Sequence, residues 1–442
     1  MKTFNRSRML FSISAYLILS LLAACKETTP DPIKPTDAYS SDVAVTWLAM
    51  QLKLTQTTPG NPVVFTRLFA YASIALYESV VPGLPAYNSL AGQLNGMPAM
   101  PTATAGLSYN WAISANAAAA SINLSLFPTT SAANKVSIDS LEAVNNTALK
   151  SSENTSPEEF SRSVEFGKKI AAAVFEWSKS DGYDNATPYT LPAGAGLWVP
   201  TPPTSAPAAL PNWGKNRLLV AGSGTGADTD TPPAYSEDAK SDFYLMAKEV
   251  YDISQNMTAD QKAIALFWND AADGKSFKPN GHWVSILKQV LIKENAKLDI
   301  AALAFAKMSI SFSDGTIVCW QRKYKYNLLR PVTYIRNTMN MAGWSPLLVT
   351  PPFPEYPSAH AVVSAAAAQA LSEVFGSTYK FTDRSYDQLG FAARSYNSFE
   401  DAAREASLSR LYGGIHFRKG AESGLVQGRK VAQNVNLLKF KK

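Results

Sequence analysis

The stretch YPSAHAVVSAAAAQALSEVFG, residues 356–376, changes character after its first five residues. Pro357 and Ser358 are typical of a helix start, and the alanine-rich run after them predicts a buried helix. His360, one of three histidines in 442 residues, falls in the first turn of that helix. Because the first N–H groups of a helix lack intrahelical acceptors, the segment predicts an anion site beside an imidazole. The alternative is an ordinary capped helix with an incidental histidine.

Helical signals continue through much of the chain. Apolar residues recur at three- and four-residue steps in 61–79, which predicts an amphipathic helix. Ser156, followed by Pro and two Glu, is a helix start, and Thr258 with Gln261 forms a second capping pattern. We find no strand-like alternation and no repeat of fixed length. The predicted fold class is therefore all-α.

One long region lacks these helical signals. Residues 184–234 contain nine prolines and many glycines. A loop of this length inside a compact chain is usually functional or disordered. Trp198 and Trp213 supply apolar side chains along it, so we expect a long proline-rich loop in the middle of the chain that packs against the helices.

The N-terminal residues form a separate unit. Residues 1–24 combine a basic start with an apolar run, which indicates a lipoprotein signal peptide, and Leu-Ala-Ala-Cys at 22–25 resembles a bacterial lipobox. Cys25 is then the lipidated first residue; the alternative is cleavage elsewhere that leaves Cys25 free. Residues 25–40 are expected to be a lipidated linker and 41–442 the helical domain. The predicted location is that of an exported lipoprotein in the cell envelope, in the periplasm or on the outer membrane.

Charge and cysteine content restrict the partners. Removing residues 1–24 lowers the net charge from +6 to +3, too little to indicate nucleic-acid binding. With Cys25 lipidated, only Cys319 remains, so neither an intrachain disulfide nor a thiolate metal site is expected. Beyond the leader we expect no membrane-spanning stretch of about 18 apolar residues. The expected membrane contact is the N-terminal lipid alone.

Two further segments carry groups suited to an oxyanion. KYKYNLLRP, residues 323–331, places Lys323 and Arg330 seven residues apart, which is two helical turns, so both cations are expected to project from one helix face. Pro331 favours a helix end at the second cation. SRLYGGIHFRKG, residues 409–420, places Arg410 and His416 on either side of a glycine pair that is expected to end a helix. Taken singly, these are also compatible with a solvated helix face and an ordinary interhelical turn.

Together, the three segments resemble a known signature. Lys-x6-Arg-Pro, Pro-Ser-Ala-His and Ser-Arg-x5-His are similar, in order and spacing, to the motifs shared by vanadium-dependent haloperoxidases and type 2 phosphatidic acid phosphatases. The segments GLWVPTPP (196–203), FWND (267–270) and NGHW (280–283) most resemble bacterial iodoperoxidase-type members.

The resemblance implies a fold built around two four-helix bundles and orthovanadate as the cofactor. It assigns catalytic roles to His360 (general base), His416 (ligand of vanadium) and Lys323. The implied reaction oxidises halide, with iodide or bromide favoured, using hydrogen peroxide to give hypohalous acid. The alternative is a periplasmic acid phosphatase with a phosphohistidine intermediate on the same residues. The implied cofactor-binding residues are Lys323, Arg330, Ser358, Ala359, His360, Arg410, His416 and Trp320.

The sequence departs from the family pattern at two positions. Ala359 replaces the usual glycine, and Gly420 stands where many members have an aspartate that orients the second histidine. Glu422 is a candidate substitute for that aspartate.

Three further residues are candidates for the surroundings of the site. Phe353 is expected to line the halide pocket, with plain packing as the alternative. His282 is expected to be structural or to face the pocket, and Asp314 is a candidate partner for an active-site arginine.

Overall fold

The computed structural model describes residues 34–228 and 230–442. Residues 35–442 form one compact unit. The predicted signal peptide, the lipidation site Cys25 and most of the predicted linker lie outside the described residues. The packed unit includes Thr36 and Tyr39, which are buried, and the Thr36 hydroxyl donates to the carbonyl of Val80.

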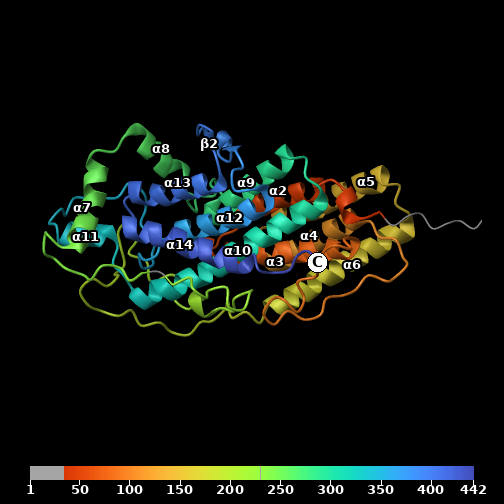
Figure 1. Cartoon of the computed structure of the whole chain (residues 1–442), viewed down its shortest axis with the longest axis horizontal. Coiled ribbons are helices and arrows are strands. Elements are labelled where there is room, and N and C mark those ends of the chain that lie inside the picture. The colour runs from red at the N-terminus through yellow and green to blue at the C-terminus, as the bar shows by residue number, and fades with distance from the viewer. Residues whose placement is uncertain (1–33, 229) are drawn as a thin grey trace, which may run out of the picture. The chain divides into compact units, whose positions relative to one another are not determined.

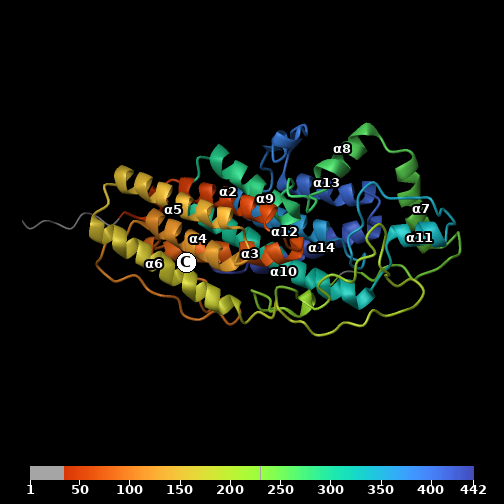
Figure 2. The same cartoon turned by 180° about the vertical axis from the view of Figure 1, so that it is seen from behind.

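The N-terminal half is a group of packed helices (Figures 1 and 2). α4 packs against α3, α5 and α6, and α2 packs against α4. The close approach of α6 to α4 requires Gly167, because a Cβ there would collide with the Ser114 carbonyl. The helices of this group are α2 (Asp42–Thr57), α3 (Pro62–Val80), α4 (Trp111–Leu126), α5 (Ala132–Ser152) and α6 (Pro157–Ser178).

The predicted apolar helix at 61–79 is α3, and it is buried on almost every side rather than on one face. Within the described residues, Pro62–Gly83 is also the one helical segment that by length and composition could cross a membrane, although it contains the charged residues Arg67 and Glu78. Its side chains, including Arg67 and Glu78, are buried inside the protein. We therefore assign α3 as a core helix.

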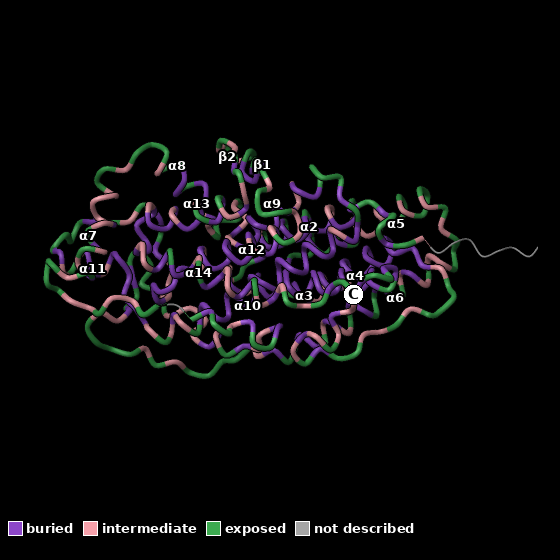
Figure 3. The backbone as a smooth tube through the Cα atoms, in the orientation of Figure 1, coloured by how far each residue is buried: buried purple, intermediate pink, exposed green. Residues whose placement is uncertain are grey.

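The C-terminal half is built around four helices that pack against one another: α10 (Leu298–Tyr326), α12 (Ala359–Phe375), α13 (Phe399–Tyr412) and α14 (Arg418–Val435). α10 also packs against α3 and so joins the two halves. Most of α10 and α12 is buried, whereas α14 is buried along one face and partly exposed along the other (Figure 3). Gly424 and Gly428 allow α14 to lie directly on the first turn of α12, because a Cβ at either would collide with backbone atoms of 358–362.

The described residues form thirteen α-helices and two three-residue strands, so the all-α prediction is confirmed. Both predicted helix starts are also confirmed: Ser156 accepts from the Glu159 N–H, and Thr258 with Gln261 makes a capping box. The remaining helices are α7 (Asp242–Gln255), α8 (Ala259–Phe267), α9 (Lys278–Lys293) and α11 (Pro331–Asn337), with 3-10 turns η1 (Thr36–Ala38), η2 (Val81–Gly83), η3 (Trp213–Lys215) and η4 (Asp387–Leu389).

A small antiparallel hairpin was not predicted. Its strands are β1 (Phe381–Asp383) and β2 (Arg394–Tyr396), with Phe381 opposite Tyr396. Three-residue strands are too short for an alternation of apolar and polar residues to be recognised.

The predicted proline-rich loop lies between α6 and α7, and its described residues contain only the short turn η3. Trp198 and Trp213 are buried, as expected of packing anchors. The backbone N–H of Trp198 donates to the carbonyl of Asn327 at 2.6 Å, and the backbone N–H of Ala209 donates to the carbonyl of Pro352 at 2.8 Å. The loop therefore holds two segments, near 327 and 352, that carry predicted site residues.

Candidate active site

Three buried cations come from three different places in the fold. Lys323 lies in the last turn of α10, Arg330 is the residue before α11, and Arg410 lies in the last turn of α13. α10 ends at Tyr326 with Asn327 in a left-handed conformation, so Lys323 and Arg330 do not share one helix face. As expected from Pro331, the second cation lies outside the helix.

None of these three cations forms a salt bridge with a carboxylate of the described residues. Lys323 Nζ donates to the carbonyls of Pro354 and Glu355, both at 2.9 Å. Arg330 donates to the carbonyls of Phe353 (2.9 Å) and Ile415 (2.8 Å). Arg410 donates to the Ser409 hydroxyl and the Trp268 carbonyl. Burying cations without a counter-ion is costly, so this cluster favours a bound anion.

Two donors beside this cluster have no hydrogen-bond partner among the described residues, Ser358 Oγ and Arg330 Nη2. Ser358 is the N-cap residue of α12, as predicted, but its hydroxyl makes no capping bond. Both groups are fully buried, where an unsatisfied donor normally costs about 1–3 kcal/mol. Unpaired donors and cations around one helix N-terminus fit a tetrahedral oxyanion such as vanadate or phosphate.

His416 lies between a carboxylate and a guanidinium. Its Nδ1 is 2.7 Å from Glu355 Oε1, and its Nε2 is 3.1 Å from Arg330 Nη1. The carboxylate must accept, so Nδ1 carries the proton and Nε2 has the lone pair. Burial lowers the pKa of His416 well below its usual value, and Arg330, Lys323, Arg410 and His360 lower it further, so the imidazole is neutral.

The orienting carboxylate is Glu355, not the expected Glu422. Glu422 is exposed on α14. Glu355 is fully buried, and it also accepts from the Phe417 N–H at 3.1 Å. Its side chain fills the space beside Gly420, where a Cβ would collide with Glu355 Oε1. Glycine at 420 is therefore what allows a carboxylate from position 355 to reach the histidine.

The cluster perturbs the pKa values of its members. Burial lowers the pKa of Lys323 to about 7, with Arg330 acting in the same direction. Burial raises the pKa of Glu355 to about 7, although Lys323 and Arg330 oppose that shift. Such perturbed groups gathered at one place are typical of functional sites.

His360 lies in the first turn of α12, as predicted, and its side chain remains 17% exposed. Its Nε2 is 3.5 Å from Asp270 Oδ2, and neither atom has another polar partner among the described residues. Burial and Arg410 lower the pKa of His360 to about 4, so the ring is a neutral base at neutral pH. Asp270 lies in the FWND segment and was not predicted as a site residue.

Two aromatic rings adjoin the cations. Phe353 packs on Trp320 with ring centroids 5.1 Å apart. Lys323 Nζ lies 5.0 Å and Arg330 Cζ 4.9 Å from the Phe353 centroid. The Trp320 indole N–H, which we expected to face an oxyanion, instead donates to the Ala209 carbonyl at 3.4 Å. Both rings thus supply apolar surface beside the cations.

Asp314 does not pair with an arginine. It is buried in α10 and accepts from the N–H groups of Leu219 and Val220 and from the Ser223 hydroxyl, so it fixes the proline-rich loop. His282 lies next to Asp270, one contact behind His360. No group of three or more His, Cys, Asp or Glu side chains in the described residues is arranged to bind a metal cation.

Comparisons with known proteins identify a family and related folds. A family model of the second helical-bundle domain of VCPO matches residues 303–440. A crystal structure of the first bacterial vanadium-dependent iodoperoxidase is similar with a TM-score of 0.84 and 34% identity, over 93% of this chain and 99% of that chain. No curated protein is significantly similar in sequence.

More distant structures share the fold. The holo and apo forms of a bacterial vanadium-dependent chloroperoxidase are each 16% identical, with TM-scores of 0.64 and 0.63, and cover 86% of this chain and 92% and 93% of theirs. At that identity they show the fold alone. The 34% identity to the iodoperoxidase over nearly the whole length shows more: the chain belongs to the vanadium-dependent haloperoxidase family.

Proposed function

We propose that this chain oxidises halide ions with hydrogen peroxide to hypohalous acid, with iodide preferred, at a vanadate held by the three buried cations and the start of α12. The observation that carries the proposal is the set of unpaired donors, Ser358 Oγ and Arg330 Nη2, next to cations without carboxylate partners. Vanadate bound there supplies a Lewis acid that activates hydrogen peroxide and keeps its own oxidation state.

The residues around the anion have distinct roles. Lys323, Arg330 and Arg410 would neutralise its charge, while the Ser358 hydroxyl and the Ala359 N–H would donate to its oxygens. His416 would offer the Nε2 lone pair, because its Nδ1 proton is held by Glu355. The methyl group of Ala359 leaves its N–H available as a donor.

His360 suits the role of general base. Its Nε2 faces Asp270, so its Nδ1 is the atom available to take a proton from hydrogen peroxide. The neutral ring can accept that proton, and Asp270 would stabilise the imidazolium that forms, as the aspartate does in a catalytic triad. Lys323, whose pKa lies at about 7, would stabilise negative charge that develops beside it.

Iodide is favoured over bromide for two reasons. The bacterial iodoperoxidase is 34% identical to this chain, and the match covers 93% of this chain. Phe353 and Trp320 present aromatic surface beside the cations, which favours a large, weakly hydrated anion.

An acid phosphatase would use the same groups, with His416 as nucleophile and His360 as proton donor to the leaving group. The family assignment favours the peroxidase, and no residue of this site argues specifically for hydrolysis.

Paired assays on one protein preparation test the proposal. Iodide oxidation should require both orthovanadate and peroxide, should exceed bromide oxidation, and should fall when phosphate competes for the site. His416→Ala should abolish it. Hydrolysis of p-nitrophenyl phosphate that vanadate inhibits, without halide oxidation, would establish the phosphatase instead.

We also propose that the protein is an exported lipoprotein anchored through Cys25, on the basis of its leader sequence. Cys25→Ala should move the protein from the membrane fraction to the soluble fraction and remove incorporation of labelled fatty acid. Fatty-acid labelling that persists in Cys25→Ala would refute this anchor.

A further inference from the structure

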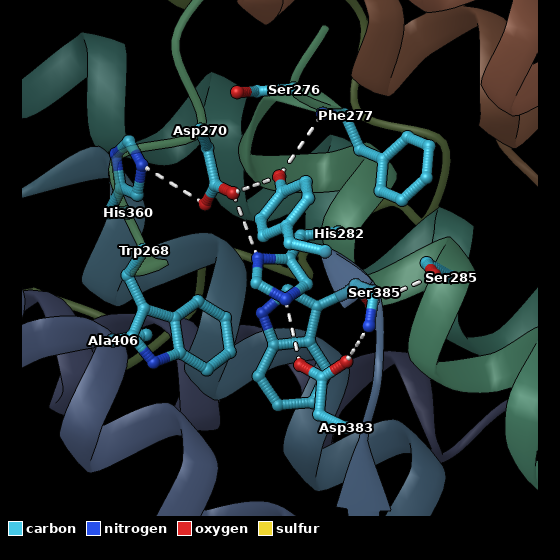
Figure 4. A network of polar contacts seen from close by, with 12 residues as sticks. Trp268, Asp270, Ser276, Phe277, His282, Ser285, His360, Asp383, Ser385 and Ala406 are labelled. Atoms are coloured by element: carbon cyan, nitrogen blue, oxygen red, sulfur yellow. Dashed lines mark hydrogen bonds and ion pairs between the residues drawn. The ribbon is translucent and has the colours of Figure 1, made fainter. Parts of the chain in front are cut away.

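Behind His360 lies a buried row of alternating acidic and basic side chains (Figure 4). His282, on α9, is 2.8 Å from Asp270 Oδ1 through Nδ1 and 2.8 Å from Asp383 Oδ2 through Nε2. Asp270 lies between α8 and α9, and Asp383 ends β1, about 100 residues after His282. The side chains of all three are at most 1% exposed.

The contacts of His282 define its protonation state. Each ring nitrogen faces a carboxylate oxygen at hydrogen-bonding distance, and an ionised carboxylate only accepts. A neutral ring would place one lone pair against a carboxylate, so both nitrogens carry protons and His282 is an imidazolium. Burial alone would lower the pKa of His282, but Asp270 and Asp383 raise it to about 10.

Surrounding groups restrict the motion of this imidazolium. Trp268 stacks on the His282 ring at 4.2 Å with an interplanar angle of 28°. The Tyr386 hydroxyl donates to Asp270 Oδ1 at 2.6 Å. At the other end, Asp383 Oδ1 accepts from the Ser385 N–H at 2.8 Å and from Gln289 Nε2 at 3.3 Å. Asp270 can therefore rotate little about its side-chain bonds.

This row of buried side chains ends at His360, the proposed general base. Asp270 Oδ2 is the oxygen that His282 and Tyr386 leave free, and it lies 3.5 Å from His360 Nε2 (Figure 4). Arg410 is the cation that faces Asp270 and His360 from α13. With His282 protonated, Asp270 and Asp383 leave one net negative charge on the group, which offsets one of the nearby cations.

We propose that His282, Asp270 and Asp383, together the His282 triad, position His360 for catalysis: the imidazolium holds Asp270 ionised and aimed at Nε2, so that the His360 proton stays on Nε2 and Nδ1 faces the substrate. The catalytic part rests on the proposed function, whereas the charge state and the tautomer do not. His282 is then a positioning residue that touches neither substrate nor cofactor.

The three histidines of the chain make a direct test possible. In protein labelled with 15N-histidine and free of vanadate, each ring can be assigned by substitution. We expect both ring nitrogens of His282 to be protonated from about pH 6 to about pH 9, well above the usual titration range of histidine. His360 should be neutral with its proton on Nε2. A neutral His282 ring at pH 7, or a His360 proton on Nδ1, would overturn the proposal.

Asp383→Asn tests whether the His282 triad sets the tautomer of His360, and it leaves Asp270 and His360 themselves unchanged. Loss of one carboxylate should bring the titration of His282 into the observed pH range and mix the tautomers of His360. The kcat for iodide should fall by roughly 10- to 100-fold, as for other residues that orient a catalytic group, while the KM for iodide changes little. An unchanged His360 tautomer together with an unchanged kcat would contradict the positioning role.

Asp299→Asn is the matched control, because Asp299 is a buried carboxylate that accepts from the Tyr87 hydroxyl at 3.0 Å at the start of α10. It should leave the histidine spectra and kcat unchanged. If Asp383→Asn does not fold, the wild-type spectrum still tests the charge state and His282→Gln tests the tautomer. Absence of halide oxidation in the wild type would refute the proposed function whatever the spectra, whereas a neutral His282 would refute the triad whatever the activity.

Discussion

Single residues explain how this site works without the usual aspartate after the second histidine. Glu355 approaches His416 from the segment before α12, and Gly420 on α14 leaves room for it. The two positions lie far apart in sequence, so the exchange of one carboxylate for another is visible only once the chain is folded. Glu355 nevertheless lies only three residues before Ser358, a predicted site residue.

Glu355→Gln should weaken binding of orthovanadate by roughly 10- to 100-fold, the usual cost of losing a partner that orients a metal ligand. The amide can still accept from Nδ1, but its neutral oxygen makes Nε2 a weaker donor to vanadium. Equilibrium dialysis of orthovanadate against the purified variant measures the effect. Glu422→Gln, an exposed carboxylate on α14, is the control and should bind normally. Equal affinity in both variants would remove Glu355 from the site.

Gly420→Ala should destabilise the fold by about 1–3 kcal/mol, the usual cost of overpacking a buried position. The added methyl meets the Glu355 carboxylate, so the cost should depend on that side chain. In a double-mutant cycle with Glu355→Ala, the penalty of Gly420→Ala should shrink by more than about 0.5 kcal/mol. Urea unfolding of the four proteins measures this, and strictly additive penalties would show that the collision is relieved elsewhere.

At this scale the sequence predicted the residues with a motif and missed those without one. Lys323, Arg330, Arg410 and His360 all lower the pKa of His416. The family resemblance singled these residues out, whereas their spacing alone was equally compatible with ordinary helix faces and turns. Asp314 was misjudged, because a carboxylate that tethers a loop by accepting backbone N–H groups has no signature of its own. Asp270 and Asp383 likewise acquire their role only through His282.

At the scale of elements, the long helices were predictable and the small connections were not. Capping residues and apolar periodicity located α3, α6 and α8, because those signals are local. The hairpin of β1 and β2 was missed, yet it delivers Asp383 to His282 on α9. The loop between α6 and α7 was expected to pack, but its contacts with Asn327 and Pro352 depend on tertiary structure.

The tie between α9 and the hairpin should make stability depend on pH. The pKa of His282 rises from an ordinary 6.5 to about 10 in the folded state, so the folded chain holds an extra proton between these values. Its stabilisation is complete below about pH 6.5 and is lost as the pH rises through about 10, since stability falls wherever the native state binds more protons. Wild type minus His282→Gln, measured by urea unfolding across this range, should show that decline. A difference that is constant with pH would mean that His282 is neutral when folded.

For the whole molecule, the packed helices form a frame that encloses the cluster of buried cations. α10 joins the halves and ends at Lys323, and the first turn of α12 is held between α10 and α14. The frame therefore keeps cations and unpaired donors in place before any anion arrives. Such preorganisation lowers stability in the free protein and increases the affinity for the anion.

Anion binding should consequently stabilise the whole molecule. A ligand at about 100 times its Kd adds about 2.7 kcal/mol if it binds only the folded state, so orthovanadate or phosphate should raise the thermal midpoint in proportion to the logarithm of its concentration. Ser358→Ala removes an unpaired hydroxyl, so it should change the stability of the free protein by less than about 0.5 kcal/mol but weaken the anion effect by about 1.5–3 kcal/mol. Ser364→Ala, on the same helix, is the opposite case, because its hydroxyl accepts from the Trp283 indole at 2.9 Å. That variant should be less stable but retain the full anion effect. If neither anion raises the thermal midpoint of the wild type, the cations do not form an anion site.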